Sequence, residues 1–343
     1  MNKTHFPGLD TLRLYAALCV IIYHGMGANF PLVLSGGIAV TLFFTLSGFL
    51  ITSILLEEKT KTGTINVHRF WIRRALRILP LYYFILVICY IVLPSLNVLY
   101  MPERWTLPGM LVFGGPFFIA VKIGYLNNAA HLWSIGVEEM FYFIFPIFVK
   151  RYRIPIICAG IIVPLLIIHF LAYYGGGPVG ADLSGMLRFD CMAIGALAAY
   201  VYHYQKPVLA LMYHPAIWIA SIIGVVLLNF HLSNVNDFEA SVIFAVFILN
   251  LATNPRLHLL EPRILAWFGQ RTYGIYMWHY PIMAIFLTVA PGIGWPLLTL
   301  SMITFTLTVA AVSYRYFEHP FLRLKDRWQP MRYPRQSSNT ISA

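Results

Sequence analysis

The stretch "LRLYAALCVIIYH", Leu12 to His24, decides the class of fold. Most of it is apolar enough for a bilayer, yet Arg13 and His24 stand near its two ends. Eleven helical steps at about 100° each put both side chains on one face, about 16 Å apart along the axis. They cannot bond each other, so we expect them to face two depths of one cavity. The alternatives are an Arg13 that snorkels or pairs with Asp10, and an interfacial His24.

The composition indicates a membrane protein with several spans. The chain has 343 residues, of which 59% are hydrophobic and only 11% are charged, whereas soluble domains carry about 25% charged residues. The net charge of +11 could suggest nucleic-acid binding. The basic residues, however, lie between apolar runs and form no basic domain, so we expect no nucleic-acid partner. Asp10 and Arg13 interrupt any signal-peptide core, so the first span is expected to be retained.

Ten segments are predicted to cross the membrane as helices, since a span needs roughly 20 apolar residues. They are 9–27, 36–56, 78–96, 131–149, 154–174, 186–203, 214–231, 237–253, 272–290 and 295–316. The stretch 107–121, "LPGMLVFGGPFFIAV", is shorter and is broken by Pro and Gly. We interpret it as re-entrant or lying on the surface.

The basic residues fix the expected orientation of these spans. With the N-terminus in the cytoplasm, only Arg104 and Lys122 fall on outer segments, while Arg13 and Arg188 lie within spans. The remaining basic residues all fall on inner segments, as the positive-inside rule demands. The prediction is an all-α bundle of about ten transmembrane helices over 1–325, with both termini cytoplasmic and no soluble domain. Residues 326–343 are expected to form a polar, disordered cytoplasmic tail.

A second group of polar residues lies in "HLWSIGVEEMFYFIFP", His131 to Pro146. His131 and Glu138 are seven residues apart and share a helical face, with Ser134 one turn before Glu138. Two carboxylates, Glu138 and Glu139, are costly within a span, and packing alone would not place them there. We therefore expect them in a functional site that reaches His24.

The loop predicted over 57–77 carries "FWIRRALRILPLYY", Phe70 to Tyr83. Arg74 and Arg77 are one helical turn apart, with Arg73 beside them. Guanidinium groups suit phosphate, although ordinary positive-inside charge or lipid headgroup binding would give the same pattern.

Weaker signals come from three further stretches. Ser47 and Gly48 in "FFTLSGFLIT" are more typical of close helix packing than of a nucleophile. Arg188 and Asp190 stand close together in "RFDCMAIGALAAY", and His279 lies in "TYGIYMWHYP". The four cysteines have neither disulfide nor metal spacing and are expected to be buried and apolar in character.

Taken in order, these stretches, closing with "SYRYFEHPFLRLK", resemble the membrane acyltransferase-3 family of bacterial polysaccharide O-acetyltransferases. The resemblance spans nearly the whole chain. It implies a multi-pass protein of the bacterial inner membrane that moves an acetyl group from cytoplasmic acetyl-CoA to a hydroxyl of a cell-surface or lipid-linked polysaccharide. In the family pattern, Arg13 and His24 match an essential pair, Arg74 and Arg77 match an inner-loop pair, and Glu138 and Glu139 match the carboxylates after "WSIGV".

The expected mechanism assigns a role to each group. Arg73, Arg74 and Arg77, with help from Arg13, would hold the phosphates of acetyl-CoA. His24, oriented by Glu138, would act as general base toward the acceptor hydroxyl. The residues expected to contact the substrate are Ser134, Trp133, Glu139, Asp190 and His279. No metal is expected.

Two alternatives stay open at this point. Direct transfer is favoured over an acyl-enzyme on Ser47, because Ser47 has no base at local spacing, and an acyl-His24 is not excluded. A different class, a proton-coupled transporter of a small anionic or sugar-like substrate, would also explain buried Arg, His and Glu. The expected partners are acetyl-CoA, a glycan or lipid-linked sugar and membrane lipids. The acceptor cannot be read from the sequence.

Overall fold

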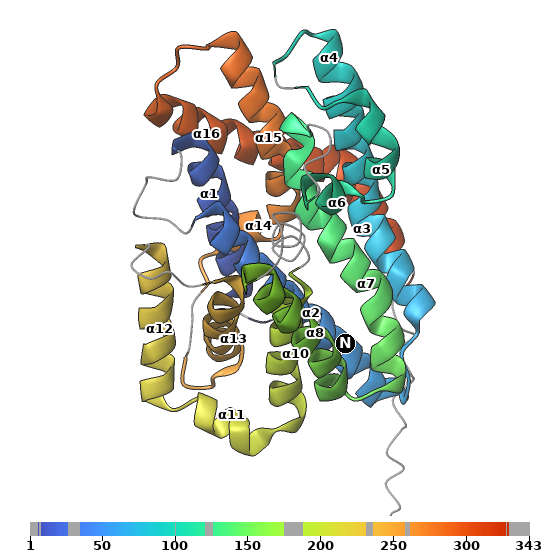
Figure 1. Ribbon diagram of the computed structural model, residues 1–343, viewed down its shortest axis with the longest axis vertical. Helices are drawn as coiled ribbons and strands as arrows, with labels where there is room; N and C mark the ends of the chain where they lie inside the picture. The colour runs from blue at the N-terminus through green and yellow to red at the C-terminus, as the bar shows by residue number, and fades with distance from the viewer. Residues whose placement is uncertain are drawn as a thin grey trace, which may run out of the picture.

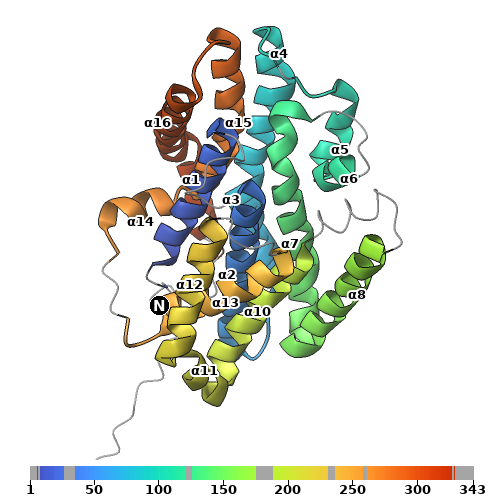
Figure 2. The same ribbon diagram turned by 60° about the vertical axis from the view of Figure 1, so that its left-hand side comes forward.

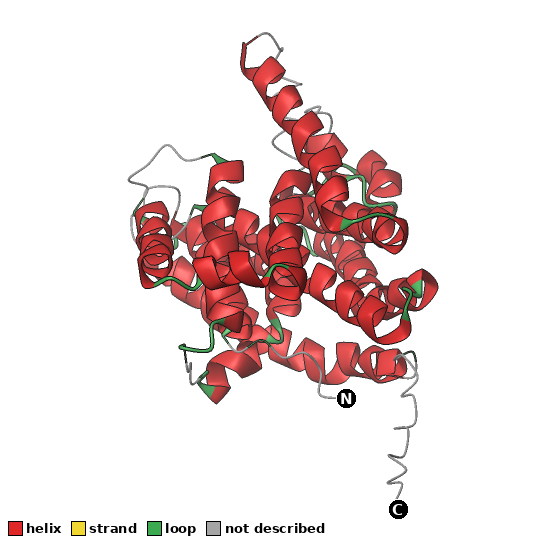
Figure 3. Ribbon diagram, turned by 90° about the horizontal axis from the view of Figure 1, so that it is seen from below, coloured by secondary structure: helices red, strands yellow, loops and turns green. Residues whose placement is uncertain are grey.

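The computed structural model describes residues 6, 8–26, 35–99, 101–120, 126–174, 188–230, 236–257, 261–326 and 328. Within these ranges the secondary structure is helical and no strand occurs, as Figure 3 shows (helices red). The all-α prediction is therefore confirmed for the described chain. The predicted tail 326–343 falls, apart from Asp326 and Trp328, outside the described residues.

Each of the ten predicted segments contains a long helix (Figure 1). These helices are α1 (Leu9–Met26), α2 (Gly36–Thr62), α3 (Val67–Val87), α7 (Trp133–Arg151), α8 (Ile154–Tyr174), α10 (Phe189–Tyr204), α12 (Pro215–Asn229), α13 (Asp237–Thr253), α15 (Thr272–Val289) and α16 (Trp295–Ser313). Shorter α-helices are α4 (Leu93–Ser95), α5 (Leu107–Leu111), α6 (Gly115–Ala120), α11 (Lys206–Met212), α14 (Arg263–Gly269) and α17 (His319–Asp326). Two 3₁₀ segments, η2 (Arg104–Thr106) and η3 (Asn127–Leu132), and two π-helical segments, η1 (Ile88–Val92) and η4 (Tyr314–Glu318), complete the set.

Five helical segments among the described residues are long and apolar enough to cross a membrane. They are Gly36–Thr62, Val67–Ser95, Asn127–Arg151, Ile154–Leu171 and Trp295–Lys325. The pair α11 and α12 would make a sixth if its 62° bend lies within one span. The chain is thus a multi-pass membrane protein by this measure. The count of ten spans and the cytoplasmic position of the termini stay predictions, as does the single membrane domain over 1–325.

The predicted loop 57–77 is wrong in extent, because most of it is helical. α2 continues to Thr62, and α3 begins at Val67. Gly63 ends α2 in the left-handed conformation at φ 76°, which glycine adopts without steric cost. The Asn66 side chain then caps α3 by accepting a hydrogen bond from the Arg69 N–H at 3.0 Å. The arginines expected in a loop therefore stand on the first half of α3.

The short apolar stretch 107–121 forms no single span over its described part. It folds as α5 and α6, separated by Phe113 at φ 64° and Gly114. The Tyr82 hydroxyl donates to the Met110 carbonyl at 2.6 Å, which ties α5 to α3. A Cβ on Gly136 of α7 would lie 2.6 Å from the Phe113 carbonyl oxygen, so this segment also packs closely on α7.

The closest helix packing joins α2 to α10. A Cβ on Gly48 would lie 1.9 Å from the Met192 carbonyl oxygen, and one on Gly195 would lie 2.0 Å from the Thr45 carbonyl oxygen. Only glycine allows this approach, in which each backbone lies against the other, as is typical of small-residue contacts between membrane helices. The expectation that Gly48 serves close packing is confirmed.

The other helices are arranged around this pair. α13 packs on α2 and α10, while α1 contacts α2, α14, α15 and α16. Figure 2 shows α8 leaning away from α7, and its principal contact is with α10. The four cysteines are buried, as expected, and none of them forms a disulfide within the described ranges. α2 therefore joins the α10–α13 group to the α1–α15–α16 group.

Replacing either packing glycine should force the two helices apart. We expect Gly48→Ala and Gly195→Ala each to lower the free energy of unfolding of the detergent-purified protein by about 1–3 kcal/mol through overpacking. Gly160→Ala on α8 is the matched control, because a Cβ there meets nothing within 4 Å. Thermal unfolding of the three variants measures the difference. Equal unfolding of all three would contradict the packing role.

Candidate active site

Arg13 and His24, which were predicted to share a functional face of α1, have different surroundings in the structure. Arg13 lines a cavity, and its Nη1 lies 3.7 Å from Asp10 Oδ1. His24, near the other end of the helix, packs against α15, where the Tyr280 hydroxyl lies 3.4 Å from His24 Nδ1. The pairing of Arg13 with Asp10 is thus present, and it leaves Arg13 on the cavity wall.

The cavity has a volume of about 90 Å³ and lies among α1, α2, α3, α7 and α15. Its charged lining consists of three arginines and one carboxylate: Arg13, Arg74, Arg77 and Glu138. Its hydroxyl groups come from Ser47, Ser134, Tyr142, Thr272, Tyr273 and Tyr276. The structure therefore brings together residues from segments that are far apart in the sequence.

Among the described residues, Arg74 and Arg77 lack a carboxylate partner of the kind that Arg13, Arg73 and Arg188 have. Neither has a carboxylate oxygen of a described residue within 4.0 Å. The Arg74 guanidinium instead lies 3.8 Å from the centroid of the Tyr142 ring, and its buried Nε has no hydrogen-bond partner among the described residues. Cations withdrawn from water are normally paired. Two such cations in one cavity make it suitable for an anion.

Arg73 does not join this pair. Its Nη2 lies 3.5 Å from Glu58 Oε2, and Glu58 Oε1 also accepts a hydrogen bond from the Asn66 N–H at 3.0 Å. Arg73 is absent from the cavity lining. Arg73 therefore does not lie with Arg74 and Arg77 in the expected phosphate site, because its guanidinium is held at the turn between α2 and α3.

Glu138 pairs with Ser47 and not with His24. Ser47 Oγ donates a hydrogen bond to Glu138 Oε1 at 2.7 Å, across 91 residues of chain. Both side chains line the cavity, whereas His24 does not. The expectation that Glu138 orients His24 is not met in this arrangement. Ser47 has no base at local sequence spacing, but the fold places a carboxylate of α7 against it.

Three imidazoles and a tyrosine gather beyond the cavity. The ring centroid of His279 lies 5.6 Å from that of His24 and 5.0 Å from that of His131. The ring centroid of Tyr280 lies 4.7 Å from that of His24. His131 Nε2 lies 3.1 Å from the Met277 carbonyl, which can only accept, so this nitrogen carries its hydrogen. His279 Nε2 is buried without a partner among the described residues. We call His24, His131, His279 and Tyr280 the histidine cluster.

Tyr276 stands between the cavity and the histidine cluster. Its hydroxyl lies 2.7 Å from Ser134 Oγ and donates to the His131 carbonyl at 2.9 Å. Its ring centroid lies 5.2 Å from that of His279. Tyr276 lines the cavity on one side and contacts two imidazoles on the other, so it forms the wall shared by the two parts of the site.

Two of the residues expected to contact substrate flank the cavity on α7. Trp133 packs on Phe44 and lies under the Arg188 guanidinium, which is 5.5 Å from its ring centroid. Glu139 has a buried Oε1 with no hydrogen-bond partner among the described residues. Neither residue lines the cavity, whereas their neighbours Ser134 and Glu138 do.

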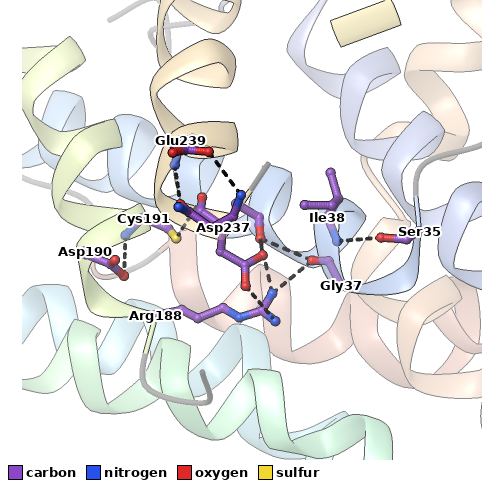
Figure 4. A network of polar contacts seen from close by, with 10 residues as sticks. Ser35, Gly37, Ile38, Arg188, Asp190, Cys191, Asp237 and Glu239 are labelled. Carbon is purple, nitrogen blue, oxygen red and sulfur yellow. Dashed lines mark hydrogen bonds and ion pairs between the residues drawn. The ribbon is translucent and has the colours of Figure 1, made fainter. Parts of the chain in front are cut away.

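Asp190 belongs to a separate polar network where the N-terminal ends of α2, α10 and α13 meet (Figure 4). Its carboxylate accepts a hydrogen bond from the Cys191 N–H at 2.9 Å. The neighbouring Arg188 pairs with Asp237, Nη2 to Oδ2 at 3.1 Å, and donates to the Gly37 carbonyl at 2.9 Å. These contacts tie three helices together, and Asp190 is not among the cavity residues.

No role was predicted from the sequence for Tyr276 or for His131, although His131 was placed on the same helical face as Glu138. His131 shares a helical face with Glu138, and Tyr276 lies three residues before His279, so both had a local signal. Within the described ranges, no group of three His, Cys, Asp or Glu side chains is placed to hold a metal ion.

Comparison with known proteins agrees with the resemblance drawn from the motifs. The model of the acyltransferase-3 family, described as an acyltransferase domain, matches residues 6–315. No solved structure matches this chain. A Staphylococcus aureus (strain COL) protein with the name "Putative O-acetyltransferase" is 27% identical over 379 residues, covering 97% of this chain and 62% of the relative.

Two further relatives carry names that refer to peptidoglycan. The "Peptidoglycan O-acetyltransferase OatA" of Listeria monocytogenes is 27% identical over 358 residues, and the "Putative peptidoglycan O-acetyltransferase YrhL" of Bacillus subtilis is 28% identical over 358 residues. Each alignment covers 93% of this chain but only 56% and 55% of the respective relative. The chain thus spans little more than half the length of these proteins. Because the family model covers nearly all of it, the chain belongs to the acyltransferase-3 family.

Proposed function

We propose that this protein transfers an acetyl group from cytoplasmic acetyl-CoA to a hydroxyl of a cell-surface or lipid-linked glycan, in the bacterial inner membrane. One observation carries the proposal: a tyrosine separates a cluster of imidazoles from a cavity with two arginines that have no carboxylate partner among the described residues. Family membership and the O-acetyltransferase names of the relatives support the reaction class. The peptidoglycan names support a cell-wall or surface glycan as the acceptor.

The arginine side of the cavity suits the donor. Acetyl-CoA carries its phosphates at the nucleotide end and its neutral thioester at the other. Guanidinium forks bind phosphate through charge-assisted hydrogen bonds, and Arg74 and Arg77 have this capacity free of any carboxylate of the described residues. We therefore assign the phosphates of acetyl-CoA to the arginine side of the cavity and its thioester end to the rest of the cavity.

The histidine cluster suits the acceptor. General-base catalysis toward an alcohol needs a neutral imidazole, whose unperturbed pKa is about 6.5. Of the three imidazoles, His131 and His279 are buried, at 3% and 0% exposure, whereas His24 is half-buried. His24 is therefore the imidazole that an incoming hydroxyl can reach, and we assign it as the general base.

Hydroxyl groups stand where the two halves meet. Ser134 and Tyr276 bring their O–H groups within 2.7 Å of each other at the wall of the cavity. Tyr276 gives its hydrogen to the His131 carbonyl, so Ser134 is the hydroxyl of this pair whose hydrogen can turn toward the cavity. Hydrogen-bond donors stabilise the oxyanion of acyl transfer, and we assign Ser134 to the carbonyl oxygen of the reacting acyl group.

Removing the base should abolish transfer while leaving the fold intact. We expect His24→Ala to lower acetylation of a glycan acceptor by about 10²–10⁴-fold, the usual contribution of a general base. Acetyl-CoA consumption and acetyl-glycan formation by the detergent-purified protein are measured together. His203→Ala on α10 is the control, because His203 lies in neither the cavity nor the histidine cluster. Full turnover by the His24 variant would refute this role, and proton flux without acyl consumption would indicate a carrier instead.

Substitutions of the arginines of α3 should separate effects on donor binding from effects on stability. Arg74→Ala and Arg77→Ala should each raise the KM for acetyl-CoA about 10-fold or more, because a charge-assisted hydrogen bond contributes about 1.5–3 kcal/mol. Arg73→Ala should leave this KM unchanged and lower the melting temperature, since it breaks the contact with Glu58. Steady-state kinetics and thermal unfolding give both quantities. A raised KM for the Arg73 variant alone would overturn the assignment.

A further inference from the structure

Ser47 differs from Thr45 and Thr60, two other hydroxyl side chains of α2. Thr45 and Thr60 each donate to the carbonyl four residues earlier in the same helix. This is the usual way for a helix to satisfy such groups. Ser47 instead donates across the cavity to Glu138 Oε1 at 2.7 Å. Its hydroxyl is thus aimed at a carboxylate from another helix, inside the cavity that we assign to the donor.

The packing of α2 keeps Ser47 in this direction. The next residue, Gly48, is pressed against the Met192 carbonyl of α10. Successive residues of an α-helix are about 100° apart, so α2 cannot turn Ser47 away without breaking this contact. A nucleophile needs such a fixed position relative to its base.

Ser47 also brings a hydroxyl group with an adjacent carboxylate to the wall of the cavity. His24 is not part of the cavity lining, and Tyr276 stands between the cavity and the histidine cluster. A serine beside a general base is the arrangement of an activated nucleophile. The geometry therefore offers a covalent route that the spacing of residues in the sequence had disfavoured.

We propose that Ser47 is a catalytic nucleophile that carries the acetyl group as an ester, with Glu138 as its base; the proposal rests on the proposed function. In the first step Ser47 Oγ attacks the thioester carbonyl carbon, and its proton passes to the Glu138 carboxylate. The C–O bond forms, the C–S bond breaks, and the departing sulfur takes the proton from Glu138 to leave as the CoA thiol. In the second step the acceptor oxygen attacks the ester while His24 takes its proton. The bond to Ser47 breaks, and the Ser47 oxygen takes a proton from water through Glu138, while His24 releases the acceptor's proton to water.

The test uses a partial reaction that needs no acceptor. The purified full chain is incubated in detergent with acetyl-CoA and radiolabelled free CoA, and the label that enters acetyl-CoA is counted. An acyl-enzyme makes this exchange reversible, so wild type should exchange and Ser47→Ala should lose exchange by about 10³-fold or more. Glu138→Gln, which keeps Ser47 but removes its proposed base, should slow the exchange. Ser53→Ala is the matched control, because Ser53 is a buried serine of the same helix outside the cavity, and it should exchange like wild type.

Mass spectrometry locates the acetyl group in the same samples. Acid-quenched wild type should carry one acetyl on the peptide that contains Ser47, removable by hydroxylamine. Ser47→Cys retains a nucleophile and should carry the acetyl as a thioester, which keeps the test open if Ser47→Ala folds poorly. Two results would overturn the role of Ser47 and leave the proposed function standing. One is acetylation of a glycan by wild type without any exchange, and the other is exchange by Ser47→Ala at the wild-type rate. If folded wild type shows neither glycan acetylation nor exchange, the proposed function is refuted, and with it the proposed role of Ser47.

Discussion

The close contact between α2 and α10 is the constraint on which the site depends. Gly48 and Gly195 let each helix press against a backbone carbonyl of the other. In a membrane, where apolar surface gains little from leaving lipid, such close van der Waals contact is a principal source of helix association. It fixes both the position and the rotation of α2. The face of α2 that carries Ser47 is thereby held opposite Glu138 of α7.

The partners of three arginines reflect the free-energy cost of burying an ion. Arg13, Arg73 and Arg188 each have a carboxylate within reach, at 3.7, 3.5 and 3.1 Å. These pairs stabilise a helix end, a turn and a junction of three helices. Arg74 and Arg77 face the cavity without such a partner among the described residues. Three buried or half-buried arginines of the described residues thus have a carboxylate partner, whereas the two on the cavity wall leave positive charge that an anionic ligand could balance.

The sequence was sufficient for features that depend on periodicity and insufficient for those that depend on which helix faces which. Hydrophobic runs located the long helices, and the eleven-residue interval placed Arg13 and His24 on one face. Spacing within a helix cannot reveal a partner 91 residues away, so the pair of Ser47 and Glu138 stayed hidden. Adjacent Arg73 and Arg74 read alike in sequence. They diverge because a step of about 100° directs one to Glu58 and the other to the cavity.

The separation of arginines and imidazoles has an electrostatic reason of its own. A base that takes a proton becomes a cation, and a neighbouring guanidinium opposes that charge. At 4 Å and an effective dielectric constant of about 20 the repulsion would be about 4 kcal/mol, whereas at about 16 Å it falls to about 1 kcal/mol. Three helical turns between Arg13 and His24 provide this distance. The proposed anion site and the proposed base can therefore lie in one bundle at different levels, with Glu138 on the arginine side.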